Sequence, residues 1–217
     1  MRIDAITVCV GSLYLDLFKQ TLPAKLDTLD SLTIVTKPGD PVSKMVKDFP
    51  SVRVVETDVF TQRKAHFNKG AALNVAFAAA SPISWALSID ADIELPSNWR
   101  ELAEPQIECG KLYGAVRDSS HTKFFLPYGY FQLWCVEDSA VRGHPLFTES
   151  YSHCGRYDTE FMIRWKSSEW KDLGFKIRHL GEPCHYWFGE GENGRHLMSN
   201  LLRGGVSKYR RRDEKLC

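Results

Sequence analysis

The sequence lacks any hydrophobic run of about 18 residues, the length at which a helix could cross a bilayer. The residues after Met1 contain neither an apolar signal-peptide core nor a cleavage pattern, so we expect no secretory leader. Neither sign of charge dominates, because the formal net charge is only +1. The overall charge therefore does not indicate binding to a nucleic acid or to a membrane surface. We therefore expect a chain without a membrane span that works in the cytoplasm, or in the host cytoplasm if a phage encodes it.

Cysteine pairs with metal-binding spacing are also absent. The six cysteines are scattered and form no CxxC pair, which excludes the common structural zinc sites. Disulfides are rare in a reducing cytoplasm, so we expect free thiols, with Cys9 in the core.

The best-known nucleotide-binding loops are missing, since no GxGxxG follows the first predicted strand and no Walker-type loop occurs. The early part of the chain nevertheless alternates like a parallel sheet with helical crossovers. The patterns predict strands at 5–10, 32–36 and 52–55 and helices at 14–29 and 42–49, with Pro23 interrupting the first helix.

The 217 residues contain no repeat or linker, so the length predicts one α/β domain over residues 1–217. We divide it into a nucleotide-sugar-binding half (1–95), an acceptor and catalytic half (96–200) and a basic tail (201–217). The second half should contain strands at 112–117 and 175–180 and a helix at 158–170.

Two carboxylates follow a strand that the apolar pattern predicts to be buried on both faces. An Ala-rich helix at 71–80 precedes the apolar strand 85–89, which Asp90 and Asp92 follow. If the strand continued, both side chains would lie on one face, at the sheet edge where α/β proteins bind ligands. Neighbouring anions need a cationic partner, which favours Mg²⁺ or Mn²⁺. On spacing alone, a solvated turn explains the two residues equally well.

Six short segments then occur in a particular order. They are Phe67-Asn68-Lys69, residues 73–77, Asp90-Ala91-Asp92, residues 126–131, residues 155–161 and Ile177-Arg178-His179. The series resembles the catalytic domain of the β-1,4-galactosyltransferases and, more broadly, the GT-A-fold glycosyltransferases, including the large family-two group. The resemblance spans about two thirds of the chain and implies a Rossmann-like GT-A fold, with a mostly parallel mixed sheet flanked by helices.

The resemblance implies how a nucleotide-sugar donor is held. Asn68 and Lys69 match residues near the donor's nucleoside and phosphates, and Asp90 matches the first Asp of the family's DXD motif, which contacts the nucleotide sugar. We add Gly11, in the turn after the first strand, as a donor contact. A UDP-sugar is the expected donor.

The metal ligands are implied in the same way, for Mn²⁺ or Mg²⁺. Asp92 matches the second Asp of the motif, which binds the metal, with Asp90 as its partner. His179 matches the family's C-terminal histidine ligand. The family's methionine ligand is replaced by Lys176, a cation that cannot ligate, so the site is simpler or gains His185.

The general base is implied at Asp158, which would take the acceptor hydroxyl's proton during an inverting transfer. A position at a helix start should keep this carboxylate ionised. The family usually has Glu immediately before the base, where this chain has Tyr157, and Glu160 is the alternative base.

Aromatic side chains are the expected acceptor or sugar contacts, because rings commonly frame such ligands. Taken individually, Tyr128, Tyr130 and Trp134 fit core positions better than sugar contacts, and Asn68 and Asn74 could be helix caps. Trp187 could belong to a lid over the donor. The set comprises Tyr128, Tyr130, Trp134, Tyr157 and Trp187.

Other functions remain open at this point. Nucleotidyltransferases share a similar sheet and acidic metal ligands, but usually carry a basic loop after the first strand, which residues 11–14 lack. A nucleotide-sugar-binding module without turnover is a third hypothesis. The acceptor of a transferase would be a glycan or a hydroxylated base in phage DNA, which the basic tail could approach. The sequence does not fix the oligomeric state.

Overall fold

The computed structural model describes residues 1–60, 67–117, 129–138, 141, 146–149 and 157–180. In this part of the chain, no helix has both the length and the apolar character needed to cross a bilayer. The elements in order are β1 (Ile3–Val8), α1 (Ser12–Thr28), β2 (Ser31–Thr36), α2 (Val42–Met45), β3 (Val52–Glu56), α3 (Lys69–Ala80), β4 (Trp85–Ile89), β5 (Ile93–Glu94), α4 (Trp99–Ala103), β6 (Leu112–Arg117), β7 (Phe131–Cys135), α5 (Tyr157–Met162), a 3-10 helix (Ser167–Glu169) and β8 (Trp170–His179).

The strands form a mixed sheet in the order β3-β2-β1-β4-β7-β6-β8-β5. The first four of these strands are mutually parallel, as the alternating pattern of the sequence predicted. The antiparallel pairing of β7 with β4 and β6 then changes the direction of the sheet. The parallel pair β6–β8 and the antiparallel pair β8–β5 complete it.

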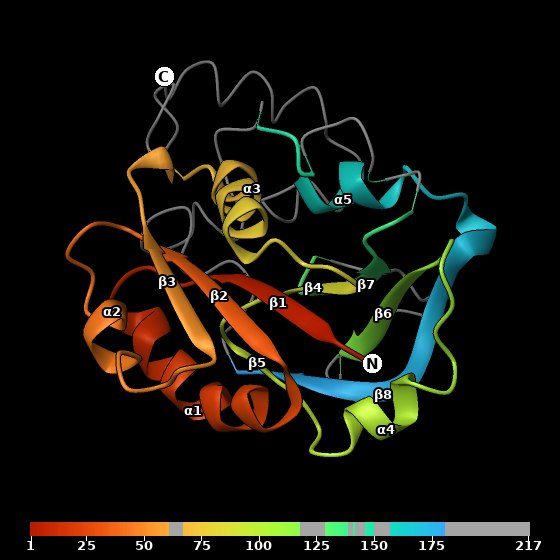
Figure 1. Cartoon of the computed structure of the whole chain (residues 1–217), viewed down its shortest axis with the longest axis horizontal. Helices are drawn as coiled ribbons and strands as arrows, with labels where there is room; N and C mark the ends of the chain where they lie inside the picture. The colour runs from red at the N-terminus through yellow and green to blue at the C-terminus, as the bar shows by residue number, and fades with distance from the viewer. Residues whose placement is uncertain (61–66, 118–128, 139–140, 142–145, 150–156, 181–217) are drawn as a thin grey trace, which may run out of the picture.

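Helices cover both faces of the sheet, with α3 and α5 on one side and α1 and α4 on the other (Figure 1). Alternate residues of each central strand enter opposite layers of the core, because side chains in a strand alternate between faces. In β4, for example, Trp85, Leu87 and Ile89 pack on the α1 side and Ala86 packs under α3. This strand is buried throughout, as predicted.

Three predicted helices differ in extent. Pro23 does not interrupt α1, which continues to Thr28 and is packed against the core. The helix predicted at 42–49 is only Val42–Met45. The helix predicted at 158–170 ends at Met162, because Trp170 is already the first residue of β8 and pairs with Leu112 of β6.

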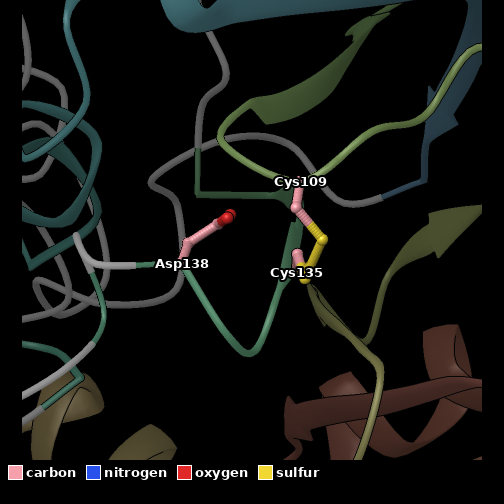
Figure 2. A group of neighbouring side chains, drawn as sticks. All are labelled: Cys109, Cys135 and Asp138. Atoms are coloured by element: carbon pink, nitrogen blue, oxygen red, sulfur yellow. A yellow bond between two sulfur atoms is a disulfide. The ribbon is translucent and has the colours of Figure 1, made fainter.

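The expectation that all cysteines are free thiols is wrong for one pair. Cys109, before β6, and Cys135, at the end of β7, form a disulfide (Figure 2). The carboxylate of Asp138 points toward this bridge, and its Oδ1 atom accepts a hydrogen bond of 2.5 Å from the Gly110 amide. Cys9 is a buried free thiol, as predicted, and burial raises its pKa to about 12. Cys154, Cys184 and Cys217 lie outside the described residues.

Candidate functional site

The Asp90-Ala91-Asp92 segment forms a turn between β4 and β5. The Asp90 amide donates to the carbonyl of Tyr130 (3.1 Å), and the Ile93 amide donates back to the Asp90 carbonyl (3.2 Å). Because β4 ends at Ile89, the condition for placing both carboxylates on one strand face is not met. The two side chains instead contact different partners, Lys69 and His179.

Asp90 is paired with Lys69, the first residue of α3. The Lys69 ammonium forms an ion pair with Oδ1 of Asp90 and lies 5.3 Å from the centre of the Tyr157 ring. Burial lowers the pKa of Lys69, but Asp90 and Tyr157 more than offset this and hold it well above its ordinary value. Lys69 therefore remains positively charged at neutral pH.

Asp92 is paired with His179, the last residue of β8. Nε2 of His179 lies 2.9 Å from Oδ2 of Asp92, and the Leu180 amide donates to the Asp92 carbonyl (2.9 Å). Only 2% of Asp92 is exposed. Burial alone would raise the pKa of the Asp92 carboxyl. The bond to His179 and the charge of Lys69 lower this pKa by a larger amount, so that the net shift is downward. The ionised form that a metal ligand requires is therefore favoured.

Asp158, in the first turn of α5, faces a glycine. Its Oδ2 atom accepts a hydrogen bond from the Gly129 amide (3.1 Å), and its carbonyl accepts one from Nε2 of Gln132 (3.3 Å). A Cβ atom at position 129 would lie 2.3 Å from Cβ of Asp158, so only glycine allows this approach. The pKa of Asp158 is raised, mainly by burial, although the Gly129 bond and Lys69 act against it. Burial thus acts against the ionised form that the position at a helix start was expected to favour, and the ionised base stays a prediction.

Lys69 connects these groups electrostatically. Its charge lowers the pKa of both Asp92 and Asp158, while Asp90 raises that of Asp158. Lys69, Asp90, Asp92 and Asp158 thus interact electrostatically and, with His179 in contact with Asp92, make up what we call the charged cluster. The roles that the ordered motifs imply for these residues stay predictions. The Asp158 carboxyl can accept a proton above its raised pKa.

The side chains of Asn68, which precedes Lys69, and of Asn74 form hydrogen bonds with the protein itself. Oδ1 of Asn68 caps α3 by accepting from the Ala71 amide (2.9 Å), while its Nδ2 donates to the carbonyl of Glu149 (2.9 Å). Asn74 clamps Phe147 through both its amide and its carbonyl (2.7 and 2.8 Å). Both ends of the Asn68 side chain thus bind the protein itself, and its contact with a donor stays a prediction.

The aromatic residues separate into two groups. Tyr130 is half-buried with its ring centre 6.4 Å from that of His179, and Tyr157 is buried against Lys69. Trp134 has no exposed surface and packs against Phe161 under α3 and α5. A side chain in that position cannot stack on a sugar, so this expectation is corrected.

The other predicted residues either make different contacts or fall outside the described residues. Gly11 sits at the start of α1 with φ +85°, and its amide donates to Oδ2 of Asp40 (2.8 Å). Glu160 lies two residues after Asp158, which turns it about 200° around a helix, so it does not share the position of Asp158. Tyr128, His185 and Trp187 fall outside the described residues, as does the basic tail.

The site partly fits a divalent ion. Two ligand atoms at right angles on an octahedral ion are separated by roughly 3 Å, which matches the spacing between Asp92 and His179. Asp90 is paired with Lys69, so Asp92 and His179 would be the protein ligands of such an ion and the rest would come from substrate or water. In the described part of the chain, the only three such ligand atoms within 4.8 Å of one another belong to Cys109, Cys135 and Asp138, whose sulfurs are joined to each other.

Two residues in or beneath the cluster were missed by the sequence reasoning. Gly129 lies within the segment 126–131 of the ordered series. Position 129 must be glycine because Asp158 approaches it closely, and the residues around Gly129 in the sequence give no sign of this distant neighbour. Lys25 is fully buried under the Asp90–Asp92 turn. The sequence does indicate that Lys25 is unusual, because Lys25 continues the apolar stripe of Phe18 and Leu22, where a hydrophobic residue is expected.

The structure has a cavity of about 470 Å³ at the C-terminal end of α1. It is lined by α1, by residues 94–97 and by Lys176 and Arg178 of β8. Neither Asp90 nor Asp158 lines it, so it is separate from the charged cluster.

Comparison with known proteins identifies the fold. No family model matches the chain, and no curated protein matches its sequence. Among solved structures, the inositol-1-phosphate CTP transferase from T. maritima aligns with a TM-score of 0.53 and 12% identity over 83% of this chain and 89% of that chain. Glucosyl-3-phosphoglycerate synthase from Mycobacterium tuberculosis, in complex with phosphoglyceric acid, aligns with a TM-score of 0.52 and 13% identity over 84% and 73%.

A third structure, described as a mycobacterial protein, has a TM-score of 0.55 and 16% identity over 84% of this chain and 68% of that chain. Likeness at these identities establishes the fold and nothing finer. The chain has the mixed α/β, GT-A-like fold found in both a nucleotidyltransferase and a glycosyltransferase, which confirms the predicted fold class.

Proposed function

We propose that this protein is a glycosyltransferase that takes a sugar from a nucleotide sugar, with UDP-sugars as the first expectation, and transfers it to an acceptor hydroxyl with inversion. The observation that carries the proposal is the position of Lys69. It pairs with Asp90 and is held near the Tyr157 ring. Its charge also acts on Asp92 and Asp158, so one cation links the donor-side acids to the candidate base.

The proposed reaction uses these residues in separate roles. The acceptor oxygen bonds to the anomeric carbon as the bond from that carbon to the diphosphate breaks, and the hydroxyl proton passes to Asp158. Lys69 divides its charge between Asp90 and the phosphates, which favours the departing anion. Asp92 and His179 would hold Mn²⁺ or Mg²⁺, which when bound supplies further positive charge for the leaving diphosphate.

A nucleotidyltransferase is the second candidate, because the T. maritima structure of similar fold is a CTP transferase. Such an enzyme would release pyrophosphate rather than a nucleoside diphosphate. Residues 11–14, at the first turn, contain no basic side chain for the triphosphate, whereas the Gly129–Asp158 arrangement offers a base for an acceptor. We prefer the glycosyltransferase because of these two features.

The deciding experiment compares the two reactions on one preparation. The protein is incubated with a panel of UDP-sugars and Mn²⁺, and separately with CTP and sugar phosphates, and the products are identified by mass spectrometry. We expect UDP and free sugar to form only with the metal, and this hydrolysis to be lost in Asp92→Asn. The matched control is Asp16→Asn, since Asp16 is an exposed aspartate of α1.

Three outcomes would overturn the proposal. Pyrophosphate release from CTP without UDP formation would identify a nucleotidyltransferase. UDP binding by calorimetry with no product under any condition would identify a binding module. Unchanged hydrolysis in Asp92→Asn would separate the reaction from this site.

The acceptor is proposed as a glycan, with a hydroxylated base in phage DNA as the second choice. A DNA acceptor would be held by phosphate contacts, so its binding should weaken steeply with salt. Acceptor binding that does not change between low and moderate salt therefore supports the glycan.

A further inference from the structure

Lys25 is a fully buried lysine on the core-facing side of α1. Its exposed fraction is 0%, and its ammonium lies 5.8 Å from the centre of the Phe18 ring. An unpaired ammonium in such a place would lose its hydration at a large free-energy cost. The position therefore calls for specific partners.

The partners belong to the turn that presents Asp90 and Asp92. Nζ of Lys25 donates to the carbonyls of Ala91 (3.1 Å) and Ile93 (2.5 Å) and to the hydroxyl of Thr21 (2.7 Å). These three acceptors match the three donors of an ammonium. The Thr21 hydroxyl in turn donates to the Ala91 carbonyl (2.5 Å), so α1 holds this peptide group through two side chains.

The charges around Lys25 have the complementary sign. Burial lowers the pKa of Lys25 to about 7, while Asp92, Asp90, Cys9 and Glu94 all act to keep it charged. Two neighbouring carboxylates repel each other, and the protonated form of Lys25 behind their turn reduces the cost of keeping both ionised. Lys69 and His179 contact the carboxylates themselves, whereas Lys25 contacts only the main chain between and after them.

We propose that Lys25, with Thr21, is a positioning residue that fixes the backbone of the Asp90–Asp92 turn and so determines where these two carboxylates lie. The catalytic meaning of this role rests on the proposed function. The structural role does not, because it is a statement about one turn and can be measured without substrate.

The test is amide hydrogen exchange in the full-length protein, comparing the parent chain with Lys25→Met and Thr21→Val. The reporters are the amides of Asp90, Ile93 and Leu180, each of which is hydrogen-bonded in or to the turn. We expect their exchange to accelerate about tenfold or more, since hydrogen bonds involving a charged group contribute at least that factor. The amides of β2 and β3, which belong to strands outside the turn, should keep their exchange rates.

Two controls separate positioning from a general loss of stability. Lys19→Met removes an exposed lysine from the same helix and should leave the turn amides unchanged. Thr21→Ser keeps the hydroxyl and should restore the slow exchange that Thr21→Val loses. If Lys25→Met does not fold, the two Thr21 variants decide the question by themselves.

The metal alone gives a second measurement. Calorimetric titration with MnCl₂ should show at least tenfold weaker binding in both Lys25→Met and Thr21→Val, with Lys19→Met at the parent value. Uniformly faster exchange across the sheet, or unchanged exchange at the three turn amides, would overturn the positioning role. Absence of any transferase activity in the parent chain would instead overturn the proposed function and leave the exchange result standing.

Discussion

Nε2 of His179 lies 2.9 Å from Oδ2 of Asp92, although the two residues are 87 positions apart in the chain. The pairing of β8 with β5 explains this contact, because it places Ile93 opposite His179. The antiparallel register thus brings a strand-end histidine to a turn that follows a different strand. Such a pair can be an isolated ion pair or two ligands of one metal ion, and the two possibilities predict different behaviour with Mn²⁺.

The first prediction concerns metal binding by this pair. The substitutions Asp92→Asn and His179→Ala should each weaken Mn²⁺ binding at least tenfold. Even the loss of a residue that only supports a metal ligand lowers metal affinity by roughly 10–100-fold. Titration calorimetry with MnCl₂ gives the affinity, and Asp16→Asn is the control. Equal affinity in the parent and both variants would mean that the pair is an ion pair without a metal.

The second prediction concerns the pH dependence of turnover. A general base works only when ionised, and burial raises the pKa of Asp158. Activity should therefore fall as the pH is lowered through a value above about 3.9, the ordinary pKa of an aspartate. The kcat/KM profile of sugar transfer measures this limb. Asp158→Asn should reduce kcat by about 10²–10⁴ and remove the limb, whereas a parental profile in this variant would exclude Asp158 as the base.

The third prediction concerns stability and the same carboxyl group. Because the pKa of Asp158 is higher in the folded chain than in the unfolded chain, folding binds its proton more tightly. This contribution to the free energy of unfolding has its full value at pH values below the pKa that Asp158 has in the unfolded chain. It is lost as the pH rises through the pKa that Asp158 has in the folded chain. The difference in stability between the parent and Asp158→Asn, measured by urea unfolding across that range, should change in this direction. A pH-independent difference would contradict the raised pKa.

The fourth prediction uses Gly129. In Gly129→Ala the new Cβ would lie 2.3 Å from Cβ of Asp158, so the carboxylate must move. We expect a loss of about 1–3 kcal/mol of stability and a fall in kcat similar to that of Asp158→Asn. Gly174→Ala is the control, because its positive φ makes a Cβ unfavourable for the backbone alone, while no neighbouring atom lies within 4 Å of the Cβ position. If the two variants have the same kcat, the close approach has no bearing on turnover.

Local patterns predicted those parts of the fold that depend on neighbouring residues. The Ala-rich helix and the apolar strand before Asp90 lie where expected, because helix propensity and burial on both faces are written in short segments. The helix expected at 158–170 was wrong in length because Trp170 pairs with β6, a long-range contact that no local pattern encodes. Competition of this kind between helix and sheet is settled only by the whole fold.

The candidate site divides in the same way. The ordered motifs led to Asp92, His179 and Asp158, which the structure gathers around Lys69. The raised pKa of Asp158 could not be read from the sequence, because it comes mainly from burial in the folded chain. The pairing of Cys109 with Cys135 was missed for a related reason, since the two are 26 residues apart and become neighbours only through the β6–β7 pairing.

The last prediction concerns this disulfide. Closing a loop of 26 residues restricts the unfolded chain and should contribute about 3–4 kcal/mol to the free energy of unfolding. The Tm of the oxidised protein should therefore fall by several degrees when dithiothreitol is added. Differential scanning calorimetry with and without the reductant provides the measurement.

The variants Cys109→Ser and Cys135→Ser test whether this bridge is the cause. Each should have the lower Tm already in the absence of reductant, and neither should respond further to dithiothreitol. A Cys9→Ser variant should keep the parental response, because Cys9 is a buried free thiol. If the parent chain and both bridge variants melt together under oxidising conditions, the bridge contributes nothing to stability, and the sheet alone holds the end of β7 in place.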